Sequence, residues 1–150
     1  MQVTEELCLK FPAVLRDKLL QNEIELPDTT QFEYEDLLTY RAVSRNTEDD
    51  SEVTLEDFKS YFELGKRPKK PRGISKDITK NPYYYGVSSF LKREIVEQKM
   101  KFPTPNKKLA VGCVYSAGGP QDTVDQHVCW CLYEGADVSG FKLIKEKDDG

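Results

Sequence analysis

The order of apolar patterns along the chain restricts its fold, because helical spacing appears early and β-prone runs gather late. Helices are predicted over residues 12–21 and 55–65, the second one begun by Thr54 with Asp57 as an acidic capping box. A further helix, begun by a serine cap, is expected over 89–100. β-prone runs predict strands over 37–43, 83–88, 109–115, 127–134 and 141–144. We therefore expect an α+β fold, with N-terminal helices followed by a mostly antiparallel sheet.

The length of the chain suits one domain. Its 150 residues can bury a core that needs no disulfide or metal to close it. No apolar run approaches the ~18 residues that a membrane span requires, so no membrane segment is expected. The first residues lack the basic start and apolar stretch of a secretory signal. We therefore expect a cytoplasmic protein whose four cysteines are free thiols.

Charge is segregated along the chain, with 6 basic and 16 acidic residues in 1–65 but 13 basic and 3 acidic residues in 66–108. The part from 66 to 82 has three prolines and no apolar periodicity, which predicts a flexible basic loop. Its cations either face the acidic run of the same chain or bind an acidic protein partner. The residues for such a partner are Lys66, Arg67, Lys69, Lys70 and Arg72.

Nucleic acid is a weaker candidate for the partner, because the whole chain carries a net charge of −4. An alternative that stays open is stacking of single-stranded bases on Tyr83, Tyr84 and Tyr85 beside the lysines. In a strand, Tyr84 would point away from the other two tyrosines. We therefore do not expect a nucleic-acid partner.

Three cysteines and the single histidine gather near the C-terminal strands. His127, Cys129 and Cys131 alternate, so one strand would present them on one face, with Cys113 expected on the neighbouring strand. Thiolates and imidazole are ligands that zinc prefers. However, structural zinc sites more often use a Cys-x₂-Cys turn, and buried free cysteines behave as small apolar residues. We interpret the cysteines as core residues and do not expect zinc.

His127 is the candidate for acid–base chemistry, because an unperturbed imidazole titrates near neutral pH. The alternative is a half-buried histidine that bonds to a backbone carbonyl. The sequence lacks a Ser-His-Asp order, a Walker motif, Gly-x-Gly-x-x-Gly and His-Glu-x-x-His. Those motifs belong to common hydrolases, nucleotide triphosphatases, Rossmann enzymes and zinc proteases, which are therefore not expected.

Three polar residues stand in otherwise apolar, β-prone surroundings: Arg41, Ser88 or Ser89, and Glu134. An arginine offers a fork for phosphate, and a hydroxyl at a helix start lies beside backbone N–H groups that favour anions. A carboxylate can hold sugar hydroxyls or stabilise an oxocarbenium ion. Together these groups would suit a nucleotide that contains pyrophosphate and ribose.

At these positions the sequence resembles the ADP-ribosyltransferase superfamily. Tyr40-Arg41 is similar to that family's first-strand arginine, Val87-Ser88-Ser89-Phe90 to its Ser-Thr-Ser strand, and Leu132-Tyr133-Glu134 to its late strand with the catalytic glutamate. The resemblance implies a split β-sandwich that binds NAD. Leu132 stands where arginine-modifying members have Glu or Gln, which leaves the acceptor open.

The resemblance also implies roles for individual residues. Arg41 would lie near the phosphates, Ser88 would support the nicotinamide ribose, and Glu134 would stabilise the oxocarbenium-like transition state. Ser89 and Tyr85 join the candidate cofactor-binding residues, and His127 joins Glu134 as a candidate catalytic residue.

Structural alternatives remain open for the same residues. Arg41 could pair with an acid of the 33–36 run, Ser88 could cap a helix, and Glu134 could be a solvated strand end. The functional alternative to an NAD-dependent enzyme is a non-enzymatic domain that binds a protein partner through the basic 66–108 region.

Overall fold

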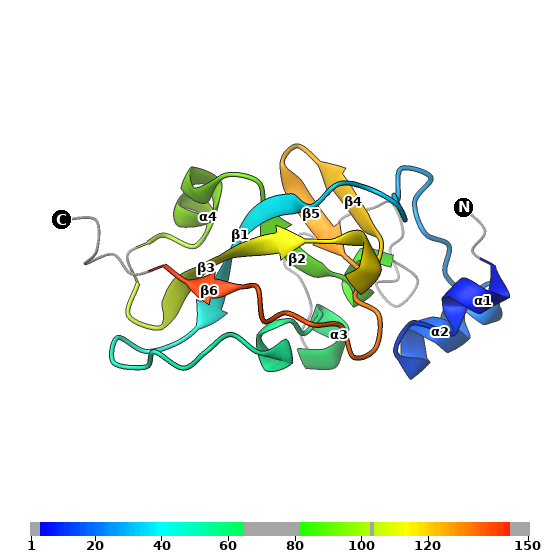
Figure 1. Cartoon of the computed structure of the whole chain (residues 1–150), viewed down its shortest axis with the longest axis horizontal. Helices are drawn as coiled ribbons and strands as arrows, with labels where there is room; N and C mark the ends of the chain where they lie inside the picture. The colour runs from blue at the N-terminus through cyan, green and yellow to red at the C-terminus, as the bar shows by residue number, and fades with distance from the viewer. Residues whose placement is uncertain (1–3, 65–81, 103, 145–150) are drawn as a thin grey trace.

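The structure is a computed structural model that describes residues 4–64, 82–102 and 104–144, and gives the main chain alone at 61, 62, 82 and 83. Its strands form a six-stranded antiparallel sheet in the order β4-β5-β2-β1-β3-β6 (Figure 1). This sheet and its flanking helices confirm the expected α+β fold. The strands are β1 (Leu37–Ser44), β2 (Val87–Phe90), β3 (Lys107–Val114), β4 (Gln121–Val124), β5 (His127–Trp130) and β6 (Lys142–Leu143).

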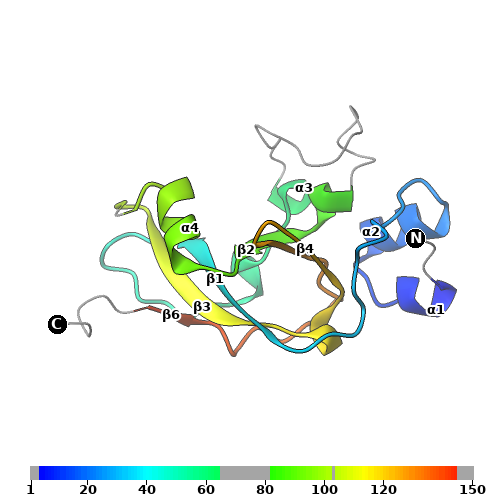
Figure 2. The same cartoon turned by 90° about the horizontal axis from the view of Figure 1, so that it is seen from above.

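The sheet consists of two half-sheets, β4-β5-β2 and β1-β3-β6, that meet at β1 and β2. β1 and β3 are in register at eight residue pairs, and β2 and β5 at four. Between β1 and β2 the described ladder has one registered pair, Tyr40 with Phe90. Figure 2 shows the sheet as a strongly curved layer, with α4 at one end of the molecule and α1 and α2 at the other.

Strand alternation assigns side chains to the two faces of this sheet. The register places Arg41, Ser89 and Val128 on one face, and Tyr40, Phe90 and His127 on the other. The Arg41 face carries the largest apolar cluster, which packs residues of both half-sheets together. Its buried members are Val43, Val53, Phe58, Val87, Ala110, Val114, Val128, Trp130, Val138 and Phe141. Burial of this cluster holds the half-sheets together where their ladder is short.

The N-terminal helices are α1 (Glu5–Cys8) and α2 (Ala13–Leu20). Thr4 caps α1 by accepting a hydrogen bond from the Leu7 N–H. The range of α2 agrees with the predicted helix over 12–21, and Pro12 immediately precedes it. A second cluster joins these helices to the end of the sheet; it contains Cys8, Phe11, Leu15, Leu19, Ile24, Leu26, Tyr85 and Cys131.

The helix expected over 55–65 is divided in the structure. Thr54 and Asp57 form the predicted capping box, but it begins a single 3₁₀ turn, Leu55–Asp57. The helix α3 (Tyr61–Leu64) follows separately. Ser60 begins this second piece, because its hydroxyl accepts the Glu63 N–H while Glu63 accepts the Ser60 N–H. Two competing caps thus divide the segment.

The helix predicted over 89–100 with a serine cap is shorter. Helix α4 is Arg93–Lys99, with Lys92 at its N-cap. Ser89 lies in β2, opposite Val128 of β5. Long-range pairing with β5 therefore overrides the local capping signal. The strand expected over 83–88 also begins late, since Pro82–Tyr85 forms a 3₁₀ turn.

The strand predicted over 127–134 is wrong in its second half, because β5 ends at Trp130. The two neighbouring strands, β2 and β4, end at the same position: Trp130 pairs with Val87 of β2 and with Gln121 of β4. Beyond it, the Tyr133 N–H donates to the Gly118 carbonyl in the loop before β4. Cys131 and Glu134 therefore follow the strand.

The expectation that Cys113 lies on a strand next to His127 is also wrong. Cys113 is on β3, whereas β5 lies between β4 and β2. β4 itself was not predicted from the sequence. It forms a hairpin with β5 through Asp125 and Gln126, which both have positive φ, 50° and 68°.

Lys66, Arg67, Lys69, Lys70 and Arg72, expected in a basic loop over about 66–82, lie outside the described residues. Within the part of the chain that the structure describes, there is no helix long and apolar enough to span a membrane.

The hairpin turn predicts the effect of a glycine substitution. A two-residue turn with positive φ at both positions favours glycine at the second one, and the side-chain oxygen Oε1 of Gln126 is buried without a hydrogen-bond partner. We expect Gln126→Gly to raise the free energy of unfolding by about 1 kcal/mol. Urea denaturation measures this change. Gln98→Gly, in the exposed surface of α4, is the control and should lower stability by a similar amount; a loss of stability in both variants would contradict the prediction.

Candidate functional site

Ser88 and His127 form a polar pair on neighbouring strands. The Nε2 atom of His127 lies 2.9 Å from the Ser88 hydroxyl. Ser88 is exposed and His127 half-buried, so solvent reaches the pair. Ser88 is opposite Cys129 in the register, and His127 is opposite Phe90. The hydrogen bond is therefore a diagonal contact between β2 and β5.

Phe90 and Lys99 extend this pair along the same face of the sheet. The rings of Phe90 and His127 have centroids 5.0 Å apart. The Lys99 ammonium lies 6.0 Å from the centroid of the Phe90 ring. Among the described residues, no ion pair joins Lys99 to a carboxylate. An exposed hydroxyl, an imidazole, an aromatic ring and a cation thus lie together where α4 meets the sheet.

Arg41 lies on the opposite face and bonds to main-chain groups. Its guanidinium donates to the Ser88 carbonyl, and at 2.9 Å to the Asp57 carbonyl. The guanidinium carbon is 4.8 Å from the centroid of the Phe58 ring. Burial lowers the pKa of Arg41 to about 10, although the negative charge of Asp57 opposes this shift. At neutral pH the side chain is still a cation.

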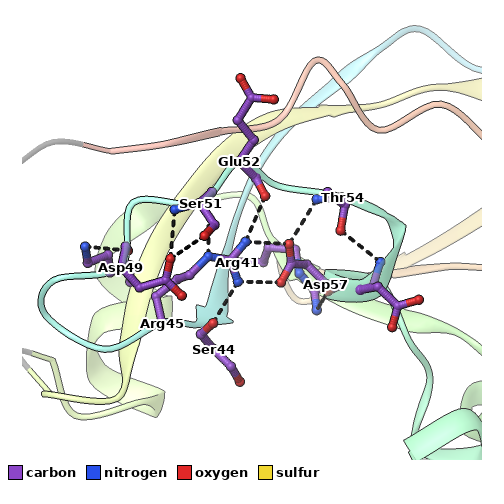
Figure 3. A network of polar contacts seen from close by, with 10 residues as sticks. Arg41, Ser44, Arg45, Asp49, Ser51, Glu52, Thr54 and Asp57 are labelled. Atoms are coloured by element: carbon purple, nitrogen blue, oxygen red, sulfur yellow. Dashed lines mark hydrogen bonds and ion pairs between the residues drawn. The ribbon is translucent and has the colours of Figure 1, made fainter.

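Arg45 and Asp57 form a buried ion pair beside Arg41 (Figure 3). Two nitrogens of Arg45 donate to the two carboxylate oxygens of Asp57, at 2.7 and 2.8 Å. Arg45 also donates to the carbonyls of Ser44, Ser51 and Glu52. Burial alone would raise the pKa of Asp57, but the bonds from Arg45 and the Thr54 N–H outweigh it and lower this pKa.

Arg41 and Arg45 both lie close to the Asp57 carboxylate. Both oxygens of Asp57 are engaged by Arg45, and one of them also accepts the Thr54 N–H. Arg41 therefore contacts two main-chain carbonyls and the Phe58 ring instead of a carboxylate. The acidic residue close to Arg41 is Asp57. The pairing considered from the sequence was with an acid of residues 33–36.

Ser89 and Tyr85 lie apart from the Ser88 hydroxyl. Ser89 is 3% exposed, shares the Arg41 face, and its hydroxyl has no hydrogen-bond partner in the structure. The Arg41 Nε atom is also buried without a partner. Tyr85 is buried in the cluster of the N-terminal helices. Neither residue is in a position to share a ligand with Ser88 in this arrangement.

Glu134 lies in the loop after β5. Its side chain is exposed, and its N–H donates to the Lys10 carbonyl at 2.8 Å. The loop is anchored there by Tyr133, whose ring centroid lies 5.1 Å from that of Phe11. The structure thus brings Ser88 to His127 and Arg41 to the Ser88 main chain, while the Glu134 main chain is bonded to Lys10, between α1 and α2.

The cysteines lie in α1, in β3, in β5 and in the loop after β5. Cys8, Cys129 and Cys131 are buried, whereas Cys113 is exposed. Among the described residues, no group of three or more histidine, cysteine or acidic side chains is arranged to hold a metal ion.

Sequence reasoning missed Phe90, Lys99 and Phe58 as neighbours of the candidate residues. Phe90 could have been found, because it lies two positions after Ser88 and shares its face in any strand. Lys99 and Phe58 carry no such local signal, since α4 and the 54–58 turn reach the sheet through tertiary packing.

The Ser88–His127 pair has a definite chemical capacity. A neutral imidazole can accept a proton from a bonded hydroxyl, and both groups can bond the hydroxyls of a sugar. The adjacent Phe90 ring is buried and packs against the imidazole, and the ammonium of Lys99 offers a charge for phosphate.

Comparisons with known proteins do not identify a family for this chain: a scan against protein-family models, a search of curated proteins and a search of solved structures find no match.

The Arg45–Asp57 pair predicts how stability depends on pH. The folded-state pKa of Asp57 is lowered, so the contribution of the pair is complete above the ordinary aspartate pKa near 4. It is lost as the pH falls through the lower folded-state value. We expect the free energy of unfolding to decrease with falling pH below about 4, as measured by urea denaturation.

In Asp57→Asn that part of the pH dependence should disappear, together with about 3 kcal/mol of stability at neutral pH, because the buried Arg45 loses its anion. Asp36→Asn, at an exposed aspartate, is the matched control and should retain the wild-type slope. An unchanged slope in Asp57→Asn would contradict the assignment.

Proposed function

We propose that the chain is an ADP-ribosyltransferase-like protein that binds NAD or a related nucleotide at the Ser88–His127 pair. The observation that carries the proposal is the 2.9 Å contact between the Ser88 hydroxyl and His127 Nε2. It lies on the serine-bearing strand that the sequence resemblance singled out.

The order of the strands supports this proposal. β1 carries Arg41, β2 carries Ser88, and β5 precedes Glu134; in the sheet, β2 lies between β1 and β5. Segments that are far apart in the sequence thus become neighbours in the sheet. The near-division of the sheet at β1 and β2 is also in keeping with a split sheet.

The exposed groups suggest how a nucleotide would be held. Ser88 and His127 would bond ribose hydroxyls, and Lys99 would bind a phosphate; Phe90 itself is buried and supports the His127 ring from within the core. Bound NAD would supply an ADP-ribosyl group attached to nicotinamide through a glycosidic bond. Arg41 takes no phosphate in this proposal, because its terminal nitrogens already donate to the carbonyls of Ser88 and Asp57.

His127, rather than Glu134, is the acid–base residue of the proposed site. His127 bonds the Ser88 hydroxyl directly, whereas the Glu134 main chain is bonded to Lys10 beside the N-terminal helices. The alternative, an acidic protein partner, depends on Lys66, Arg67, Lys69, Lys70 and Arg72 and stays a hypothesis from the sequence.

Ser88 and His127 are the residues expected to bind NAD. In isothermal titration calorimetry, Ser88→Ala and His127→Ala should each weaken NAD binding about tenfold, because each removes a hydrogen-bonding group from the site. Glu134→Gln is the control and should bind as the wild type does. An absence of NAD binding to the wild type, or a loss confined to Glu134→Gln, would refute the proposed site.

Lys99 is the residue expected to contact a phosphate of NAD. Lys99→Gln should weaken NAD binding about fivefold, because a single exposed charge pair contributes about 1 kcal/mol. The same variant should bind nicotinamide riboside, which has no phosphate, as the wild type does. Lys142→Gln, exposed on β6, removes an equal charge and should leave both affinities unchanged. Equal losses for both ligands in Lys99→Gln would contradict the phosphate contact.

A further inference from the structure

We infer that Arg41 is a positioning residue, which holds the Ser88 hydroxyl against His127 from the opposite face of the sheet. This inference gives Arg41 a role within the proposed nucleotide site, and so rests on that function for its biological meaning. The geometry that it describes is independent of any ligand.

The two edges of β2 are supported differently. On its β5 side, β2 is in register at four residue pairs. On its β1 side, the registered pair is Tyr40 with Phe90, two residues away from Ser88. The Arg41 guanidinium then donates to the Ser88 carbonyl. A side chain thus supplies a link between the half-sheets near the point where the backbone ladder ends.

The bond between Ser88 and His127 is sensitive to the direction of the Ser88 side chain. Diagonal neighbours on antiparallel strands have Cα atoms about 7–8 Å apart, so a hydrogen bond between them depends on the local twist of both strands. The Ser88–His127 bond is such a contact. Fixing the carbonyl of Ser88 fixes the peptide plane that follows it, and hence the direction in which the Ser88 side chain leaves the strand.

Arg41 itself is held by the 54–58 turn. Its other terminal nitrogen donates to the Asp57 carbonyl at 2.9 Å, and the Phe58 ring lies beneath the guanidinium. The Asp57 carboxylate is held in turn by Arg45. The planar guanidinium of Arg41, whose fork geometry is fixed, therefore links the 54–58 turn to the Ser88 carbonyl.

The test uses the single histidine of the chain as its reporter. Imidazole ¹⁵N and ¹H chemical shifts and the pH titration of His127 are recorded without ligand for the wild type, Arg41→Met, Arg41→Lys and Ser88→Ala. We expect the His127 signals of Arg41→Met to move most of the way from wild-type values to those of Ser88→Ala. Arg41→Lys keeps the positive charge but not the fork, and should move part of the way.

The control separates positioning from a general loss of stability. Leu15→Ala removes a buried side chain from the N-terminal cluster and should lower the melting temperature without moving the His127 signals. Wild-type His127 signals in both Arg41 variants would overturn the inference. If Arg41→Met does not fold, Arg41→Lys decides alone, and wild-type signals in it overturn the inference.

A second measurement distinguishes this inference from the proposed function. NAD titrations of the same variants should show weaker binding in the order in which the His127 signals move. If the signals move while the wild type binds no NAD, the positioning role stands and the proposed function fails. If the wild type binds NAD and the His127 signals of the Arg41 variants stay in place, the positioning role fails and the nucleotide site stands.

Discussion

The junction between β1 and β2 is the constraint on which the rest of the structure depends. One registered pair joins the half-sheets, so the ladder alone contributes little there. Apolar side chains from both halves, among them Val87, Ala110 and Trp130, are buried together on one face. Since burial of apolar area is not directional, this core holds the halves together without fixing their register. The directional constraint between the half-sheets is the hydrogen bond from Arg41 to the Ser88 carbonyl.

The electrostatics of this junction explain why Arg41 and Arg45 behave differently. Arg45 has a carboxylate partner in bidentate geometry, and its pKa is raised by this hydrogen bond despite burial. Arg41 has carbonyl oxygens and an aromatic face, and its pKa falls to about 10 because burial is its largest influence. A guanidinium with a pKa near 10 still carries its charge at neutral pH, so Arg41 retains both hydrogen bonds.

The sequence predicted elements whose signal is local. The ranges of β1 and α2 follow from the apolar spacing of their own residues, and the Thr54–Asp57 capping box is visible in four consecutive positions. Ser89 shows the limit of such signals. A serine before an apolar helical pattern can be either a helix cap or a strand residue, and the local sequence is the same in both cases. Its pairing with Val128, far along the chain, decides the outcome.

The candidate site was predictable in its residue types and not in its partners. Glu134 was expected in a strand because Leu132 and Tyr133 continue the apolar run, yet a strand ends where its neighbours end, at Val87 and Gln121. A single sequence contains no pattern that marks where the neighbouring strands end. Ser88 and His127 are 39 residues apart, and their contact depends on the twist between β2 and β5.

The proposed site has the imidazole of His127 where the resemblance implies the carboxylate of Glu134, and this difference has a chemical consequence. A carboxylate stabilises an oxocarbenium-like transition state through its negative charge, whereas His127 is neutral or positive at every pH of interest. The hydroxyl–imidazole pair is therefore suited to holding ribose and to moving a proton, but it supplies no negative charge at the breaking glycosidic bond. Within the proposed function, the site is therefore expected to bind the nucleotide rather than to transfer ADP-ribose, because Glu134 follows β5 and its main chain is bonded to Lys10.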